Sequence, residues 1–263
     1  MKLHFRKLGE GQPLIILHGL FGSSDNWQTV GKLLSEHFEV YLVDQRNHGH
    51  SPHSDWWNYQ SMSDDLFELI TDNHLESAVV LGHSMGGKTA MLFAIEYPAK
   101  LERLIIADIA PKYYPVHHHE IIKALTSINL DTVHTRKEAE EILSQYLNDF
   151  GTKQLLLKSL YWKEETAKKL DWRFNLRVIS KNIEAVGEPL KVVNKKCFVP
   201  ALFLRGEKSK YVLDSDFEQI TKTFPNAQLK TIANAGHWLH AEQPILFVKE
   251  VIEFLHNKKQ KKS

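Results

Sequence analysis

The sequence contains one cysteine, Cys197, which excludes an internal disulfide and favours a reducing, cytoplasmic compartment. No apolar run approaches the roughly 20 residues that a membrane-spanning helix needs, and the N-terminus shows no signal-peptide core. Charge is nearly balanced, with 33 lysines and arginines against 32 aspartates and glutamates. This balance gives no basis for a nucleic-acid or membrane partner, so the lysine-rich run at 258–262 is expected to be a solvated tail.

What the 263 residues do contain is a long series of apolar runs, and 43% of all residues are hydrophobic, which is enough for a substantial core. The runs have the continuity of buried parallel strands, and they alternate with helical patterns. Strands are predicted over residues 2–7, 13–17, 40–43, 78–81, 101–109, 201–204 and 228–232. This alternation predicts an α/β fold with a mostly parallel central sheet flanked by helices.

The alternation lapses between residues 111 and 196. Apolar positions there recur at helical spacing, and no segment is convincing as a strand. We therefore expect a helical cap, or lid, inserted at 111–196 into an α/β core made of 1–110 and 197–263. The aromatic side chains of the insertion are expected mainly to fill its own interior.

The run from Gly82 to Gly87, Gly-His-Ser-Met-Gly-Gly, joins the predicted strand 78–81 to a helical pattern. A strand, a serine between glycines and a helix are typical of a nucleophile elbow, G-x-S-x-G, in which a sharp turn exposes the serine hydroxyl. The positions two before and two after the serine must then be small, as Gly82 and Gly86 are. The following helix would direct the positive end of its dipole at Ser84.

The same letters also fit a phosphate-binding loop, G-x-x-x-x-G-K-[ST], which runs from Gly82 through Lys88 to Thr89. The strand that carries Asp108 could then supply a magnesium-binding aspartate. The rest of the chain separates the two interpretations, because a serine nucleophile needs a partner histidine and an oxyanion loop, whereas a phosphate loop needs neither.

Loops that follow predicted strands carry suitable groups, and parallel strands bring such loops to one rim of the sheet. The run His18–Gly22 could supply an oxyanion-hole amide, and His237, in a glycine-bearing loop, could reach back to the serine. In the loop after the strand 40–43, Asp44 and Arg46 are expected to pair with each other and with neighbouring backbone groups and so hold its shape. His48 in the same loop is expected to be structural.

Together these motifs resemble those of the α/β-hydrolase superfamily over nearly the whole chain, with the cap as the divergent part. The resemblance rests on His18-Gly19, Asp44-x-Arg46-x-His48-Gly49-x-Ser51, Gly82-x-Ser84-x-Gly86 and Gly236-His237. The chain looks most like the small bacterial esterases of the YbfF type, whose relatives hydrolyse carboxylic esters and acyl thioesters. The resemblance implies a serine hydrolase that takes a small-molecule ester or acyl thioester through an acyl-enzyme, and it makes Lys88 an ordinary residue of the first helical turn.

The acid of the implied catalytic triad departs from the superfamily's usual pattern, which places it a few residues after the strand 201–204. The run 206–209, Gly-Glu-Lys-Ser, offers a serine there. Asp108 lies near the end of a strand next to the elbow strand, on the same rim, and the similar esterases use an acid at this place. We expect Asp108 to orient the histidine, with Glu207 and Asp214 as alternatives.

The remaining site residues follow from these roles. Backbone N–H groups of Leu20 and Met85 are expected to form the oxyanion hole, and Phe21 and Trp238 to edge an apolar substrate pocket. Neither a cofactor nor a metal is expected, since consecutive histidines such as those at 117–119 point in different directions on a helix. A C–C bond hydrolase or lyase that keeps the serine and histidine, and a non-catalytic ligand-binding protein, remain alternatives.

Overall fold

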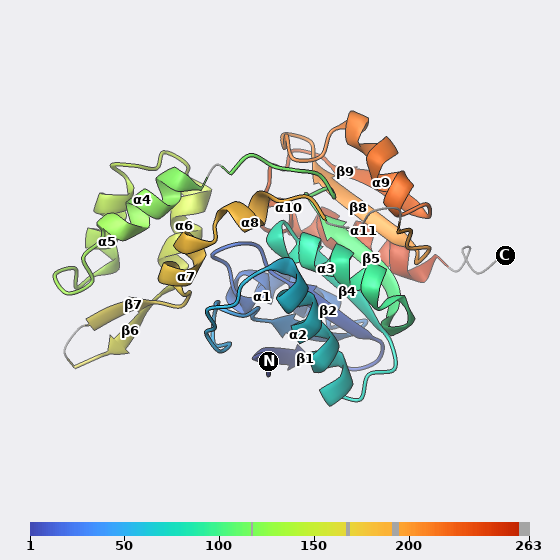
Figure 1. Cartoon of the computed structure of the whole chain (residues 1–263), viewed down its shortest axis with the longest axis horizontal. Coiled ribbons are helices and arrows are strands. Elements are labelled where there is room, and N and C mark those ends of the chain that lie inside the picture. Colours follow the sequence, from blue (N-terminus) through green and yellow to red (C-terminus); the bar gives the residue numbers. More distant parts are fainter. Residues whose placement is uncertain (117, 167–168, 191–194, 258–263) are drawn as a thin grey trace.

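A seven-stranded sheet forms the centre of the computed structural model, which describes residues 1–116, 118–166, 169–190 and 195–257 (Figure 1). Its strands are β1 (Phe5–Leu8), β2 (Pro13–Leu17), β3 (Glu39–Val43), β4 (Ala78–His83), β5 (Leu101–Ala107), β8 (Ala201–Gly206) and β9 (Ala227–Ile232). They lie in the order β1-β3-β2-β4-β5-β8-β9, with β1 antiparallel to β3 and the other neighbours parallel. The predicted α/β fold with a mostly parallel sheet is confirmed. His117 and the lysine-rich tail lie outside the described residues.

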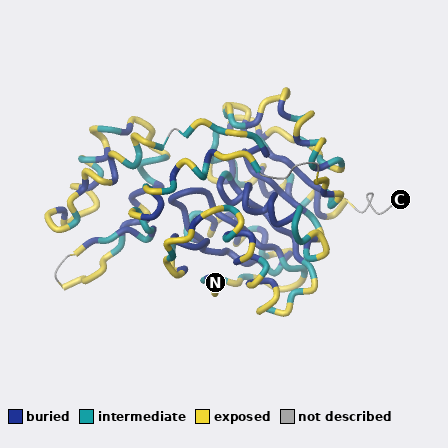
Figure 2. Tube along the Cα trace, viewed as in Figure 1, coloured by how far each residue is buried: buried dark blue, intermediate teal, exposed yellow. Residues whose placement is uncertain are grey.

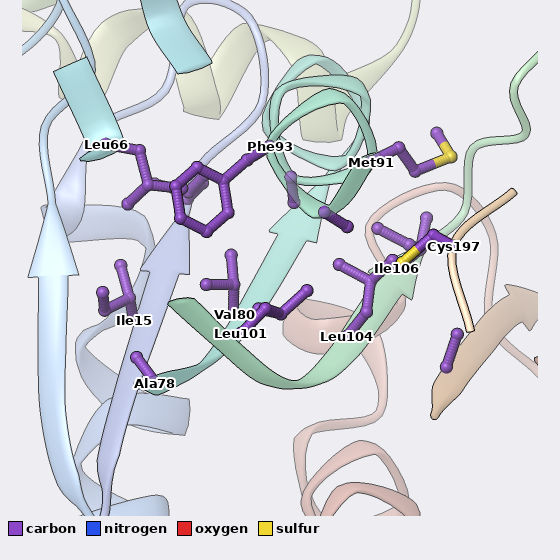
Figure 3. Close-up of a cluster of buried hydrophobic side chains, with 14 of the residues drawn as sticks. Ile15, Leu66, Ala78, Val80, Met91, Phe93, Leu101, Leu104, Ile106 and Cys197 are labelled. Carbon is purple, nitrogen blue, oxygen red and sulfur yellow. The ribbon is translucent and has the colours of Figure 1, made fainter. Parts of the chain in front are cut away.

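Helices cover both faces of this sheet, because alternate side chains of each buried strand point to opposite sides. Val79 and Leu81 of β4 join an apolar cluster with α1, α10 and α11, whereas Val80 joins a cluster with α2, α3 and α9. Figure 3 shows part of the second cluster, in which Phe93 of α3 lies beside Leu66 of α2. Burying such side chains contributes roughly 1.5–3 kcal/mol each. The helix bounds are α1 (Gln28–Leu34), α2 (Tyr59–Asp72), α3 (Met85–Glu96), α9 (Phe217–Thr223), α10 (Leu239–Glu242) and α11 (Pro244–His256), with short 3-10 turns η1 (Ser24–Trp27), η2 (Pro98–Lys100) and η3 (Asp214–Asp216).

Two element boundaries near the site have clear local causes. Helix α2 begins at Tyr59 because the Asn58 side chain accepts a hydrogen bond from the N–H of Ser61 and caps the helix. Strand β5 ends at Ala107, before the predicted end at residue 109, since Asp108 leaves the strand with a backbone φ of 51°. This earlier end places the carboxylate of Asp108 at the rim of the sheet.

A second lobe lies to one side of the sheet and is built from the chain between β5 and β8 (Figure 1). We call it the cap lobe. Its elements are α4 (His119–Ser127), α5 (Arg136–Leu143), α6 (Phe150–Lys158), β6 (Leu160–Glu164), β7 (Lys169–Trp172) and α7 (Leu176–Lys181), and the chain returns to the sheet through α8 (Glu184–Gly187). A third apolar cluster joins the lobe to Leu20, Phe21 and Met85 of the core. Figure 2 shows buried residues at this junction, with exposed residues at the far end of the lobe.

The expectation that the insertion contains no strand is wrong. Strands β6 and β7 form an antiparallel pair in which Leu160 faces Trp172 and Trp162 faces Leu170. Leu160, Leu170 and Trp172 are buried, whereas the exposed end of β6 carries charged side chains. The pair was missed because few β-branched residues mark it and its hydrogen bonds are satisfied by a neighbouring segment rather than by the main sheet.

Candidate active site

Ser84 lies at a sharp turn between β4 and α3, where its φ and ψ are 51° and −116°. A non-glycine residue rarely adopts such a conformation, and it persists only where the surrounding structure enforces it. A Cβ added at Gly82 would lie 2.2 Å from the carbonyl oxygen of Gly86, and one added at Gly86 would lie 2.5 Å from that of Leu17. Both glycines are therefore required for β2, β4 and α3 to approach one another, and the turn holds Ser84 at the edge of a cavity.

Asp108 and His237 meet at the same rim of the sheet. The Nδ1 atom of His237 lies 2.7 Å from Oδ2 of Asp108, a distance typical of a charge-assisted hydrogen bond. Asp108 is fully buried, and its other oxygen accepts the N–H of Gly206 over 3.2 Å. Because Nδ1 donates to the carboxylate, Nε2 is left as the acceptor that a nucleophilic hydroxyl would need.

Ser209 occupies the place where the usual triad acid is absent from the sequence, and its hydroxyl donates to Oδ2 of Asp108. Glu207 instead accepts the N–H of Asn234, and Asp214, which is 91% exposed, pairs with Arg205. In the described part of the chain, neither alternative acid hydrogen-bonds to His237. The sequence shows a serine at the position where the superfamily usually has the acid. Its contact with Asp108 can be found only from the structure.

Ser84 and His237 line one cavity of about 440 Å³. Among the described residues, no hydrogen bond joins the serine hydroxyl to the imidazole. Catalytic hydrogen bonds are often loose before substrate binds and tighten in the complex, so a shared cavity wall is compatible with proton transfer between the two groups.

The loop that carries His237 is fixed from several directions. The ring of Tyr211 stacks on the imidazole at a centroid distance of 3.9 Å. Nε2 of His83, the residue before Ser84, lies 2.8 Å from the carbonyl oxygen of His237. The carboxylate of Glu242 accepts the N–H groups of Gly236 and Trp238, on either side of the histidine. None of these supports was predicted, because each contact joins segments that are read separately in the sequence.

Two further buried histidines lie behind this loop and are kept neutral. Burial, reinforced by the charge of His237, lowers the pKa of His83 well below its usual value and lowers that of His240 to about 3. His240 also stacks on Trp27, with ring centroids 3.9 Å apart. A neutral pair does not repel a positive charge on His237 when that imidazole takes up a proton.

Hydrogen bonds within the loop His18–Gly22 fix the orientation of one of its N–H groups. The carbonyl oxygen of Gly19 accepts from the N–H of Gly22 over 3.0 Å and lies 2.8 Å from Nδ1 of His18. In a trans peptide the N–H points opposite to the C=O, so these bonds orient the N–H of Leu20, which belongs to the same peptide group. In the described residues, no acceptor takes the N–H of Leu20 or that of Met85, the first residue of α3.

The expected ion pair between Asp44 and Arg46 is wrong, whereas the expected bonds of both side chains to backbone groups are confirmed. Arg46 forms a bidentate pair with Asp65 of α2, with distances of 2.6 and 2.8 Å. Asp44 instead accepts the backbone N–H groups of Ser24 and His50. The two charged groups thus have different partners, which their closeness in the sequence does not reveal.

Lys88 lies in the first turn of α3, and its ammonium group is bonded to a distant part of the chain rather than exposed to solvent. Its side chain is 1% exposed, and its Nζ donates to the carbonyl oxygens of Val186, Gly187 and Glu188, at the end of α8. Burial lowers the pKa of Lys88 to about 8. The lysine therefore ties α3 to the chain that returns from the cap lobe.

The cavity lies between the strand ends and the cap lobe. Its apolar wall includes Leu20, Phe21, Ile121, Leu155 and Leu156, and its polar wall includes Asp149, Thr152 and Glu242. Trp238 also lines it, as well as a second cavity of about 450 Å³ that shares Asp149, Leu155 and Glu242. Both predicted substrate contacts, Phe21 and Trp238, thus face the same space. The part of the chain that the structure describes contains no cluster of residues suited to a metal ion.

Comparison with known proteins gives consistent matches. A family model described as alpha/beta hydrolase fold matches residues 12–153. The chain is 36% identical to the sn-1-specific diacylglycerol lipase ABHD11 of Danio rerio over 256 residues, which cover 94% of this chain and 79% of that protein. It is 35% identical to esterase YbfF of Escherichia coli, with 93% of each chain covered. A solved structure titled marine microorganism esterase is 47% identical and superposes with a TM-score of 0.93. The match covers 96% of this chain and 99% of the chain in that structure.

Proposed function

The chain belongs to the α/β-hydrolase family, and we propose that it hydrolyses carboxylic esters or acyl thioesters of small molecules through an acyl-enzyme on Ser84. The observation that carries the proposal is the 2.7 Å contact between His237 and the buried Asp108 at a cavity that Ser84 also lines. The lipase and esterase names of relatives that align along most of the chain support the reaction class.

In the proposed mechanism, His237 takes the proton of Ser84 as the hydroxyl attacks the acyl carbonyl. Asp108 holds the imidazole with Nδ1–H toward the carboxylate, so that Nε2 is the base, and it stabilises the imidazolium. The imidazolium then gives its proton to the departing alcohol or thiol. Water activated by the same histidine hydrolyses the acyl-enzyme, so the cycle requires no cofactor beyond water.

The developing oxyanion is held by the N–H groups of Leu20 and Met85. The geometry of the Gly19–Leu20 peptide supports this role for Leu20, and the position of Met85 at the start of α3 adds the positive end of the helix dipole. Loss of one such donor typically costs about 2.7–4 kcal/mol of transition-state stabilisation.

The segment 111–196 acts as a cap over the core formed by 1–110 and 197–263 in this proposal. Its support is that Ile121, Leu155 and Leu156 of the cap lobe line the same cavity as Ser84. Phe21 and Trp238 contact the apolar part of the substrate. In the described residues, no helix is long and apolar enough to cross a membrane. The free and buried Cys197 supports a cytoplasmic location.

The first prediction is that Ser84 reacts covalently with a fluorophosphonate. Peptide mapping of the labelled protein should place the adduct on Ser84, and both labelling and p-nitrophenyl ester hydrolysis should be lost in Ser84→Ala and His237→Ala. Ser180→Ala, which changes a serine of the cap lobe remote from this chemistry, is the matched control. Labelling at another residue, or ester turnover that survives Ser84→Ala, would refute the mechanism.

Substrate panels separate the remaining alternatives. Matched acyl groups on p-nitrophenol and coenzyme A compare an ester with a thioester, and carbon-acid substrates test for C–C cleavage. A ligand-binding protein would bind these compounds without turnover, and its biological activity would survive Ser84→Ala.

A further inference from the structure

The oxyanion loop is pinned at Phe21 by groups from two other parts of the chain. Phe21 has a backbone φ of 60°, in the left-handed region that few non-glycine residues adopt. Its N–H donates to Nε2 of His48 over 3.2 Å, and its C=O accepts from Oγ of Ser159 over 2.9 Å. The peptide groups on both sides of Phe21 are therefore fixed, one residue away from the N–H of Leu20.

Ser159 belongs to the cap lobe, between α6 and β6, and is itself immobilised. It is 5% exposed, its N–H donates to the carbonyl oxygen of Leu156 over 2.9 Å, and its own carbonyl accepts from Arg173 over 2.8 Å. A hydroxyl held in this way can act as a fixed donor. Its acceptor, the Phe21 carbonyl, lies 138 residues away in the α/β core.

His48 supplies the opposing contact and is also connected to the cap lobe. It is fully buried, its Nδ1 lies 3.0 Å from the carbonyl oxygen of Arg46, and burial lowers its pKa to about 3. The neutral ring keeps Nε2 as an acceptor for Phe21 at neutral pH. The loop that carries His48 pairs with Phe174 and Asn175, which follow β7.

We propose that Ser159 is a positioning residue for the oxyanion hole, so that the cap lobe contributes to transition-state stabilisation as well as covering the cavity. The inference rests on the proposed function. An oxyanion donor is effective only if it is oriented before charge develops. If the Ser159 bond is lost, the strained conformation at Phe21 is no longer held from the cap side, and the N–H of Leu20 can turn away from the position that the oxyanion occupies.

The test compares Ser159→Ala and Ser159→Cys with Ser180→Ala. Cysteine nearly fills the space of serine but is a much weaker donor, which guards against a folding defect in the alanine variant. Ser180 is a matched control in the same lobe, because its Oγ is buried and has no hydrogen-bond partner in the described residues. The measurements are kcat and KM for a p-nitrophenyl ester, and the affinity of an alkyl boronic acid, which mimics the tetrahedral intermediate.

We expect both Ser159 variants to lose about fivefold to tenfold in kcat, the scale set by one neutral hydrogen bond, with KM changed less than about twofold. Boronic acid affinity should fall by the same factor, and Ser180→Ala should match the wild type in both. Unchanged kcat in both Ser159 variants, a KM effect alone, a kcat loss without weaker boronic acid binding, or an equal loss in Ser180→Ala would overturn the inference. Wild-type protein that neither turns over esters nor reacts at Ser84 would instead refute the proposed function.

Discussion

At the scale of single residues, the carboxylate of Asp108 is held by more than its histidine partner. It accepts from the hydroxyl of Ser209 and the N–H of Gly206 while it contacts His237. A buried carboxylate that accepts several hydrogen bonds keeps a fixed orientation. The division of roles is then testable, because Asp108 acts on the imidazole directly and Ser209 acts only through Asp108.

We predict that Asp108→Asn lowers kcat by about 10⁴-fold, because the amide cannot enforce the required imidazole tautomer. Ser209→Ala should cost about tenfold to hundredfold, the worth of a hydrogen bond to a charged group. Asp214→Asn, which removes an exposed carboxylate outside the cavity, should retain wild-type kcat. Steady-state kinetics on all three variants measures these losses in kcat. A larger loss in Asp214→Asn than in Asp108→Asn would show that Asp108 is not the acid that orients the histidine.

At the scale of elements, Lys88 joins helix α3 to the end of α8. The folded-state pKa of about 8 lies below the ordinary value of 10.5, so between these values the unfolded chain holds a proton that the folded chain has lost. Stability must therefore rise with pH across this window. We predict that the unfolding free energy of the wild type, relative to Lys88→Met, increases by up to about 3 kcal/mol from pH 8 to pH 10.5. Urea unfolding of both proteins at several pH values measures this difference in unfolding free energy. A difference that stays constant or falls as pH rises would contradict the lowered pKa of Lys88.

The main elements around the site could be predicted from the sequence, because each is encoded locally. Apolar continuity marks β4 and β5, and the glycines at 82 and 86 mark the turn between β4 and α3. The partners of Arg46 and Lys88 could not be predicted, since each is chosen by contacts with a distant segment. The β6–β7 pair was missed for a related reason, because its strands are stabilised by each other rather than by a strong local propensity.

At the scale of the whole molecule, buried neutral histidines make stability depend on acid. These histidines are His18, His48, His83 and His240. Burial lowers the pKa of each below 6.5, and it lowers the pKa of His48 and His240 to about 3. The unfolded chain therefore binds protons that the folded chain excludes. Their stabilising contribution is present above pH 6.5 and is lost as pH falls toward 3. We predict an uptake of about three protons on unfolding near pH 5, from His48, His83 and His240, and about one fewer in His240→Gln. The slope of unfolding free energy against pH gives the uptake, and an identical slope in the variant would contradict the assignment.

In the proposed mechanism, Ser84 carries the acyl group between the two halves of the reaction. The decisive measurement is acid quenching during turnover of a p-nitrophenyl ester, followed by mass spectrometry of the peptides. We predict one acyl group on the peptide that contains Ser84, formed at the rate of the p-nitrophenol burst and absent from Ser84→Ala. Turnover of the ester with the acyl group on another residue, or burst kinetics that persist in Ser84→Ala, would contradict it.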